Sequence, residues 1–395
     1  MPALRLVADA NIPLAREAFA SAGEVTALPS AEITPEAVRD ADVLLVRSVT
    51  RVGDALVEGS RLAFVGTATI GTDHVDVDAL GRRGIGFASA PGSNAESVVE
   101  WVLAALVETA LRQSVPLGGR TVGVVGAGNV GGRLVPRLAA LGLRVVVCDP
   151  PRQRRGDAVP RGAADEWTDL DALLDASDIV TLHVPLMRAG ADATRGLLSA
   201  GRLARMRPGA WLVNASRGDV VDGDAARDAR LGGRLGALLL DVFPDEPTPD
   251  AALVAACDLA TPHIAGHSFD GKVGGTRMLR DALDAWLVAS GHPTPTPFDW
   301  DAALALSPDD ARPLPSVPDD ASDVAQALGP LVRALYPIAD DDARLRACFG
   351  LGDAACFAEL RRTYPRRRRW GLYDVPPDVP ARWQRAVRDG LGLRG

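Results

Sequence analysis

The sequence predicts an α/β protein in which two domains, each built on a doubly wound parallel sheet, precede a smaller C-terminal α+β domain. Its short apolar runs are continuous rather than alternating, as in strands that helices cover on both faces. Helical segments separate these runs, which is the arrangement of a parallel sheet. The strand–helix series begins twice, and a length of 395 residues suits two or three domains.

The first series lies in the N-terminal part of the chain. Residues 4–10, 42–48 and 62–68 are predicted to form buried strands. Residues 94–113 form the strongest predicted helix, because Asn94 can cap it and apolar residues recur at helical spacing.

The second series begins at residue 121. A helix is predicted at 130–142, and the predicted strands are 121–126, 143–149, 178–185, 210–216, 235–243 and 258–263. The two series predict two α/β domains, and the family resemblance given below implies that one of them is inserted into the other. The expected segments are 1–93 and 259–288 for the outer domain, 94–258 for the inserted domain and 289–395 for the C-terminal domain.

The C-terminal segment begins with a Pro-rich stretch at 291–300, which is predicted to be a linker. Acidic clusters at 309–310 and 340–342 and a basic run at 361–369 follow it. We expect these charges to form a solvated surface, and the alternative is a face that binds a second copy of the chain.

Composition excludes several classes of protein. A net charge of −8 argues against a general nucleic-acid binder, and no apolar run approaches the roughly 18 residues that span a bilayer. The four cysteines are too scattered for a disulfide framework, so we expect a cytoplasmic protein. No Cys/His cluster indicates a metal site.

A glycine-rich turn joins the predicted strand at 121–126 to the helix that follows. In GAGNVG, Gly126 permits a tight turn, Gly128 lets the backbone approach a pyrophosphate, and Gly131 lets the helix pack on the strand. The backbone N–H groups around Asn129 and Val130 would face the phosphates at the N-terminus of the helix. This context predicts a dinucleotide site.

Asp149 ends the next predicted strand and indicates which dinucleotide binds. A carboxylate there would accept hydrogen bonds from the ribose hydroxyls and repel a 2′-phosphate, which favours NAD over NADP. Two alternatives remain: Arg152, Arg154 and Arg155 would suit a 2′-phosphate, or Asp149 only caps the next turn.

One of the five histidines is the best candidate for a proton acceptor. His263 follows a predicted strand, and the loops at the carboxyl ends of parallel strands build binding sites. His183 ends a strand of the same domain and is expected to pack near the cofactor, whereas His74 is expected to be structural.

Three later motifs resemble a known family. NASRGDVVD (214–222), LDVFPDEP (240–247) and TPHIAGHS (261–268) resemble, in order and spacing, the signatures of the D-isomer-specific 2-hydroxyacid dehydrogenases. The resemblance implies two domains that close around NAD and a 2-hydroxy acid. It implies that Arg217 binds the substrate carboxylate and that Glu246 orients a catalytic His263. It also implies cofactor contacts from Val184, Ala215, Ser216, Arg217, Asp241 and Gly266.

These residue types suit the chemistry. A planar guanidinium binds a carboxylate through two hydrogen bonds and polarises the neighbouring carbonyl. A carboxylate on the far ring nitrogen of a histidine fixes its tautomer and stabilises the imidazolium.

The resemblance is most specific to the branch of the family that oxidises 4-phospho-D-erythronate in the synthesis of pyridoxal 5′-phosphate. The resembling stretches are 7–17, 44–52, 64–76, 90–102, 148–152 and 263–276. Arg47 would supply charge to a phosphate, and Ser48 and Thr69 would supply hydroxyls to the substrate. His267 stands where this branch has a substrate-pocket tyrosine, and Val184 stands where it has a threonine.

We therefore expect an NAD-dependent dehydrogenase that converts 4-phospho-D-erythronate to 2-oxo-3-hydroxy-4-phosphobutanoate. The resemblance implies that residues 289–395 form a homodimer interface. A contact between Arg346 and the substrate phosphate is a separate hypothesis. Neither a nucleic acid nor a membrane is an expected partner. One alternative is a dehydrogenase for another phosphorylated or short 2-hydroxy acid, and the other is an NAD-responsive binding protein or corepressor without turnover.

Overall fold

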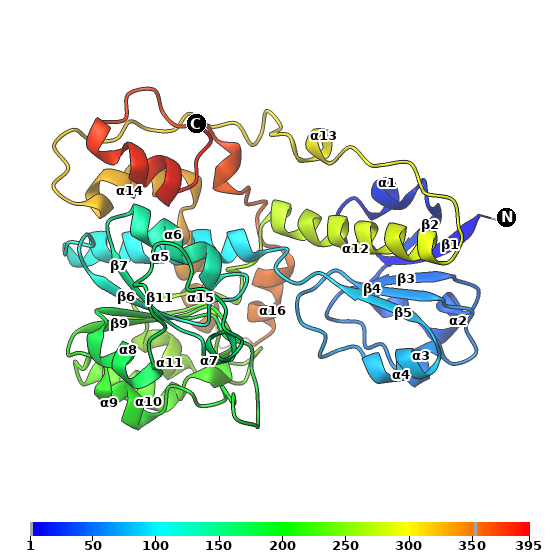
Figure 1. The fold of residues 1–395 in the computed structure, drawn as a ribbon, viewed down its shortest axis with the longest axis horizontal. Helices are drawn as coiled ribbons and strands as arrows, with labels where there is room; N and C mark the ends of the chain where they lie inside the picture. The colour runs from blue at the N-terminus through cyan, green and yellow to red at the C-terminus, as the bar shows by residue number, and fades with distance from the viewer. Residues whose placement is uncertain (1–2, 351–353) are drawn as a thin grey trace. The chain divides into compact units, whose positions relative to one another are not determined.

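A computed structural model describes residues 3–350 and 354–395 of the chain (Figure 1). They form two compact units, here called unit 1 (Met1–Asn94 and His267–Asp309) and unit 2 (Ala95–Gly266 and Asp310–Gly395). Each unit contains one parallel sheet, which confirms the predicted α/β architecture. The chain returns to unit 1 at residue 267, after the last strand of unit 2, whereas the sequence predicted a return at 259.

Unit 1 contains a five-stranded sheet in the order β2-β1-β3-β4-β5, with all neighbours parallel. Its strands are β1 (Leu4–Asp9), β2 (Gly23–Leu28), β3 (Val43–Val46), β4 (Phe64–Thr67) and β5 (Gly86–Ser89). The three predicted strands are β1, β3 and β4. The edge strands β2 and β5 were not predicted, because they are only partly buried and therefore lack a continuous apolar run.

Helices cover both faces of this sheet. One face packs against α1 (Ala15–Phe19), α12 (Phe269–Ala289) and α13 (Trp300–Leu304). The other packs against α2 (Pro35–Val38), α3 (Asp54–Val57) and α4 (Val77–Arg82). Alternate residues of β3 point to the two faces, with Val43 and Leu45 on one side and Leu44 and Val46 on the other.

Unit 2 contains a six-stranded parallel sheet in the order β11-β10-β9-β8-β6-β7. The strands are β6 (Thr121–Val125), β7 (Arg144–Cys148), β8 (Ile179–Leu182), β9 (Ala210–Asn214), β10 (Leu235–Leu240) and β11 (Leu259–Ala260). All six were predicted, because the sheet is covered on both faces and its strands are almost continuously apolar.

Two layers of helices cover the sheet of unit 2 (Figure 1). One layer contains α5 (Ala95–Gln113) and α6 (Gly131–Ala140), with α14 (Val324–Leu335) packed on α5. The other contains α8 (Leu170–Ala176), α9 (Ala200–Arg205), α10 (Gly223–Leu231) and α11 (Ala251–Ala256). The short helix α7 (Pro150–Arg154) follows β7. Leu345 of α15 (Ile338–Gly350) and Phe357 of α16 (Ala354–Arg362) belong to the same core as the second layer.

The C-terminal region is helical rather than α+β. In the described part of 289–395, the paired extended backbone is limited to an isolated bridge between Asp374 and Arg394. Residues 310–395 belong to unit 2, and α14 and α15 pack on α5. These residues therefore complete the core of unit 2, and the predicted dimer interface stays a prediction.

The sequence predicted that the charged clusters of this region form a solvated surface, and this prediction is wrong for several of their residues. Arg367, Arg368, Asp310, Asp341 and Asp342 are buried. Arg368 forms an ion pair with Asp310, so opposite charges far apart in sequence compensate each other inside unit 2.

The structure also links Cys348 to Cys356 by a disulfide, a pairing that the sequence did not predict. Cys148 and Cys257 are buried free thiols. Across residues 3–350 and 354–395, no helix combines the length and the apolar character needed to cross a membrane.

Candidate active site

The candidate residues of unit 2 all lie at the carboxyl ends of its parallel strands. Gly126, Asp149, Val184, Ala215, Asp241 and His263 come after β6, β7, β8, β9, β10 and β11, in that order. Ligands of open parallel sheets bind at this edge. The topology therefore brings together residues that span more than a third of the chain.

The turn after β6 has the backbone that a dinucleotide requires. Gly126 has φ of 90°, and a Cβ there would lie 2.5 Å from the carbonyl oxygen of His183. A Cβ on Gly131 would lie 2.0 Å from the carbonyl oxygen of Gly126. A Cβ on Gly128 would meet nothing within 4 Å, so the turn is open on the side of Gly128. These residues fit a pyrophosphate at the N-terminus of α6.

Asp149 both caps α7 and contacts the glycine turn. One oxygen of its carboxylate accepts the N–H of Arg152 at 3.1 Å, and the other accepts the N–H of Ala127 at 2.8 Å. Each oxygen has a second lone pair, which leaves capacity for ribose hydroxyls. The capping role was one of the alternatives, and it is compatible with cofactor binding.

The three arginines after Asp149 form ion pairs within unit 2. Arg152 and Arg155 bind Asp157, and Arg154 binds Asp192. Because each guanidinium already faces a carboxylate, these arginines do not form a prepared site for a 2′-phosphate.

His263 and Glu246 form a hydrogen-bonded dyad. Nδ1 of His263 lies 2.6 Å from Oε2 of Glu246, whose other oxygen accepts the N–H of Phe243 at 2.9 Å. Burial opposes ionisation of Glu246, but the hydrogen bond and charge of His263 and the N–H of Phe243 outweigh it, so the pKa of Glu246 lies below its ordinary value. With Nδ1 facing the carboxylate, Nε2 is the nitrogen that can exchange a proton with a ligand.

Arg217 lies in the loop after β9, whose shape is set by Asn214. Oδ1 of Asn214 accepts the N–H and hydroxyl of Ser216, and its Nδ2 donates to the carbonyl of Arg217. The next residue, Gly218, packs so closely on the loop after β10 that a Cβ would lie 2.0 Å from the carbonyl carbon of Phe243. This contact places the Arg217 loop beside the loop that leads to Glu246.

Asp241 organises the loop that contains His263. Its buried carboxylate accepts hydrogen bonds from the hydroxyl of Thr261 and from the N–H groups of Ile264 and Ala265. Burial raises the pKa of Asp241. The charge of His263 and the three hydrogen-bond donors act in the opposite direction but do not cancel this effect. The predicted contact with nicotinamide stays a prediction, and one lone pair of Oδ2 is left for it.

His183 is buried at the end of β8. Its Nε2 lies 2.9 Å from the hydroxyl of Thr181, and burial lowers its pKa to about 3. A ring with so low a pKa is a weak proton acceptor near neutral pH, and the choice of His263 as the base stays a prediction.

The residues predicted to surround the rest of the substrate, apart from Arg217, lie in unit 1. Arg47 and Ser48 follow β3, and Thr69 follows the neighbouring strand β4. The ring of His74 and the hydroxyls of Thr67 and Thr69 form a hydrogen-bonded chain that ends at the carbonyl of Gly71. His267 directly precedes α12, which Ser268 caps.

Lys272 in the second turn of α12 was missed by the sequence reasoning. Burial and the nearby charge of Arg47 both lower its pKa. Two cations within electrostatic range at the carboxyl edge of a sheet attract an anion. The sequence did contain a signal that could have singled out Lys272, because it is the single lysine among 43 lysine and arginine residues.

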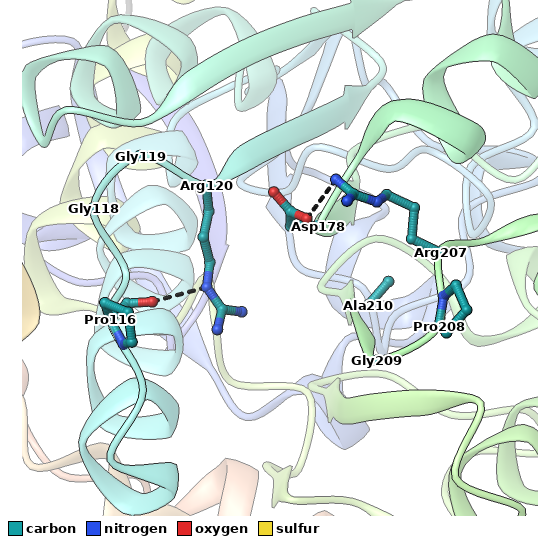
Figure 2. Close-up of a pocket in the computed structure, with 9 residues that line it drawn as sticks. All are labelled: Pro116, Gly118, Gly119, Arg120, Asp178, Arg207, Pro208, Gly209 and Ala210. Carbon is teal, nitrogen blue, oxygen red and sulfur yellow. Dashed lines mark hydrogen bonds and ion pairs between the residues drawn. The ribbon is translucent and has the colours of Figure 1, made fainter.

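A concavity in unit 2 lies at the amino ends of its strands, and Figure 2 shows the residues that line it. It has a volume of about 400 Å³ and is lined by Pro116, Gly118, Gly119, Arg120, Asp178, Arg207, Pro208, Gly209 and Ala210. Arg207 pairs with Asp178, and Arg120 stacks on Trp211 at 4.5 Å. Because these residues lie before or at the start of β6, β8 and β9, the concavity is separate from the candidate site at the carboxyl ends.

Comparisons with known proteins agree with this geometry. Residues 97–265 match the model of the D-isomer-specific 2-hydroxyacid dehydrogenase NAD-binding domain, and residues 316–389 match a domain of unknown function (DUF3410). The curated erythronate-4-phosphate dehydrogenase of Salinibacter ruber is 49% identical over 399 residues, and the match covers 100% of both chains. The chain belongs to the erythronate-4-phosphate dehydrogenase family of D-isomer-specific 2-hydroxyacid dehydrogenases.

A second relative in this family, from Azotobacter vinelandii, is 47% identical over 92% of this chain and 93% of its own. The solved structure of the TT0316 protein from Thermus thermophilus has 28% identity and a TM-score of 0.62, over 75% of this chain and 100% of that one. A D-lactate dehydrogenase from Aquifex aeolicus, solved with NAD and lactic acid, shares the fold at 23% identity and a TM-score of 0.56, over 72% of this chain and 96% of its own.

As a member of this family, the protein is an NAD-dependent oxidoreductase that acts on a CH–OH group. The predicted family and cofactor are therefore confirmed. The roles of individual residues stay predictions, and they are developed below.

Proposed function

We propose that the protein oxidises the C2 hydroxyl of 4-phospho-D-erythronate to 2-oxo-3-hydroxy-4-phosphobutanoate, a step towards pyridoxal 5′-phosphate. The main support is the full-length identity to curated erythronate-4-phosphate dehydrogenases, which includes the C-terminal region. The dyad of His263 and Glu246 supports the same conclusion at the level of chemistry.

His263 removes the proton of the substrate hydroxyl through Nε2. Glu246 holds the ring through Nδ1 and stabilises the imidazolium that forms. NAD⁺, when bound, accepts the hydride that leaves C2. The turn of Gly126 to Gly131 and the carboxylate of Asp149 would bind its pyrophosphate and ribose, with further contacts from the loops after β8, β9 and β10.

Arg217 binds the C1 carboxylate of the substrate. Its guanidinium is partly exposed, and one nitrogen donates to the carbonyl of Ser216 at 2.7 Å. That hydrogen bond restricts the side chain, while the other donors stay available for a carboxylate.

The phosphate of the substrate is bound in unit 1 by Arg47 and Lys272, with Ser48 and Thr69 as polar neighbours. Support comes from the mutual repulsion of the two cations, which a dianion would relieve. His267 takes the place of a tyrosine in this substrate pocket.

The C-terminal region contributes to a cytoplasmic homodimer in this proposal. The mass of the purified protein in solution, measured by light scattering, tests the oligomeric state. A mass of one 41.3 kDa chain at micromolar concentration contradicts the dimer.

Steady-state kinetics with NAD⁺ test the substrate. We expect kcat/KM for 4-phospho-D-erythronate to exceed that for D-erythronate and for 3-phospho-D-glycerate by at least about a hundredfold. D-erythronate lacks the phosphate, and a paired phosphate is worth several kcal/mol. 3-Phospho-D-glycerate is one carbon shorter, so its phosphate lies closer to its carboxylate and does not fit the same pair of anion contacts. Equal rates with 3-phospho-D-glycerate would reject the substrate, and NAD⁺ binding without turnover on any 2-hydroxy acid would favour a binding protein.

An arginine variant tests the phosphate site. Arg47→Ala is expected to raise KM for the phosphorylated substrate about tenfold to a hundredfold with little change in KM for NAD⁺. Arg61→Ala is the matched control, because the side chain of this arginine of unit 1 is 59% exposed and pairs with Asp42. Equal effects of the two substitutions would refute a phosphate contact at Arg47.

A further inference from the structure

We propose that Arg367, in the C-terminal region, is a positioning residue for the catalytic histidine. Its guanidinium binds the carbonyl of Ala265 and so fixes the loop that presents His263. The inference rests on the proposed role of His263, and it does not depend on which 2-hydroxy acid is the substrate.

The loop needs external support because of its backbone. His263 has φ of 54°, in the left-handed region that a residue with a side chain adopts only when its surroundings hold it there. Its N–H donates to the carbonyl of Asp241 at 2.7 Å. A ring that must place Nε2 at a substrate hydroxyl tolerates little movement of this backbone.

Ala265 is held from two sides. On one side its N–H donates to the carboxylate of Asp241 at 2.9 Å. On the other side its carbonyl accepts Nη2 of Arg367 at 2.6 Å, and the same nitrogen donates to the carbonyl of Ser97 in α5 at 3.1 Å. Arg367 therefore connects the catalytic loop to the central helix of unit 2.

Arg367 is itself enclosed by unit 2. It is 7% exposed, and its guanidinium lies 4.3 Å from the ring centre of Tyr336. Burial opposes its charge, but the oxygens of Tyr336 and Tyr364 and the carboxylates of Glu100 and Asp341 outweigh this, so its pKa lies above the ordinary value. A permanently charged donor in this environment makes a strong hydrogen bond to a carbonyl.

The same region also binds the segment before His263. Asp342 accepts the N–H of Ala260 at 3.0 Å, and Arg346 donates to the carbonyl of Cys257 at 2.8 Å. Arg346 thus binds the backbone just before β11 within unit 2. Its contact with a substrate phosphate stays a prediction. Asp342, Arg346 and Arg367 all lie in residues 316–389, which match a domain of unknown function. In this proposal, that domain helps to position the catalytic histidine.

Kinetics of the full-length chain give the first test. Arg367→Met is expected to lower kcat about tenfold to a hundredfold, with the Kd of NAD⁺ changed less than about threefold, because the base is displaced while the glycine turn is intact. Arg367→Lys keeps one donor and is expected to recover part of the lost kcat. If Arg367→Met does not fold, the double variant Glu100→Gln/Arg367→Met is used instead, because it also removes the buried carboxyl group that the charge of Arg367 stabilises as a carboxylate.

Hydrogen exchange of the same proteins gives a second test that needs no substrate. The amides of Ile264 and Ala265 are expected to exchange about tenfold faster in Arg367→Met than in the wild type. Arg280→Lys is the matched control. Arg280 is also buried and also binds two backbone carbonyls, those of Ala18 and Thr296, but it lies in unit 1.

These outcomes decide the proposal. Faster exchange at Ile264 and Ala265 with reduced kcat in the Arg367 variants alone supports it. A folded Arg367→Met protein with wild-type exchange and kcat overturns it, and so does an equal loss in Arg280→Lys. If the wild type does not oxidise 4-phospho-D-erythronate, the substrate assignment fails, and exchange alone then decides the role of Arg367.

Discussion

At the scale of single residues, the proposed chemistry depends on which ring nitrogen of His263 faces a carboxylate. Glu246 accepts Nδ1–H and is itself fixed by the N–H of Phe243. The sequence motif predicted the pairing of Glu246 with His263. It did not predict that the carboxylate of Asp241 accepts three hydrogen bonds from the His263 loop, because a motif does not show where backbone N–H groups point.

Glu246→Gln tests the dyad. Glutamine can keep the hydrogen bond from Phe243, but its amide N–H₂ would face Nδ1–H of His263 and favour the wrong tautomer. We expect kcat to fall about a hundredfold to ten-thousandfold with little change in the Kd of NAD⁺, as measured by NADH formation and by cofactor titration. A loss of less than threefold would contradict a role for Glu246 in orienting the base.

At the scale of elements, the carboxyl ends of the strands position the cofactor. The first residue of α6, Gly131, packs directly on the turn that follows β6. Only a residue without a side chain fits there, because a Cβ would overlap the carbonyl of Gly126. The spacing of the glycines predicted this contact, since the third glycine of such a turn allows the helix to pack closely on the strand. By contrast, the short edge strands β2 and β5 have too little apolar surface for the pattern to reveal them.

Gly131→Ala tests this close approach. We expect the Kd of NAD⁺ to rise at least about tenfold, because the helix must shift away from the turn that faces the pyrophosphate. Gly201→Ala in α9 is the matched control, since a Cβ there meets nothing within 4 Å and alanine favours a helix. Similar NAD⁺ affinity in the two variants, measured by calorimetry, would argue against the predicted pyrophosphate site.

At the scale of the whole molecule, the C-terminal region is part of the core of unit 2. Glu100 of the buried helix α5 accepts the N–H of Trp370, and Arg333 of α14 pairs with Glu108 of α5. Burial raises the pKa of Glu100 from 4.5 to about 7, even though the charge of Arg367 acts in the opposite direction. The stability of unit 2 is therefore linked to pH.

The sign of this linkage follows from the raised pKa. Below pH 4.5 both the folded and unfolded chains bind the proton of Glu100, so the group has no effect. Between pH 4.5 and about 7 the unfolded chain loses this proton first, so its contribution lowers the free energy of unfolding as pH rises. We expect Glu100→Gln to flatten this part of the profile, measured by thermal unfolding at several pH values. An unchanged slope would contradict the linkage.

The sequence by itself determined the two parallel sheets and the glycine turn, because continuous apolar runs and a glycine-rich turn are local properties of the chain. Its motifs also determined the dyad and the family, through their order and spacing. Only the tertiary structure decided the surroundings of Lys272 and the burial of Arg367. Lys272 is adjacent to Arg47 because α12 returns to the first sheet after more than two hundred residues. Arg367 belongs to a basic run typical of a solvated surface. It is buried because Glu100, Asp341 and the carbonyl of Ala265 compensate its charge, and these partners are far apart in sequence.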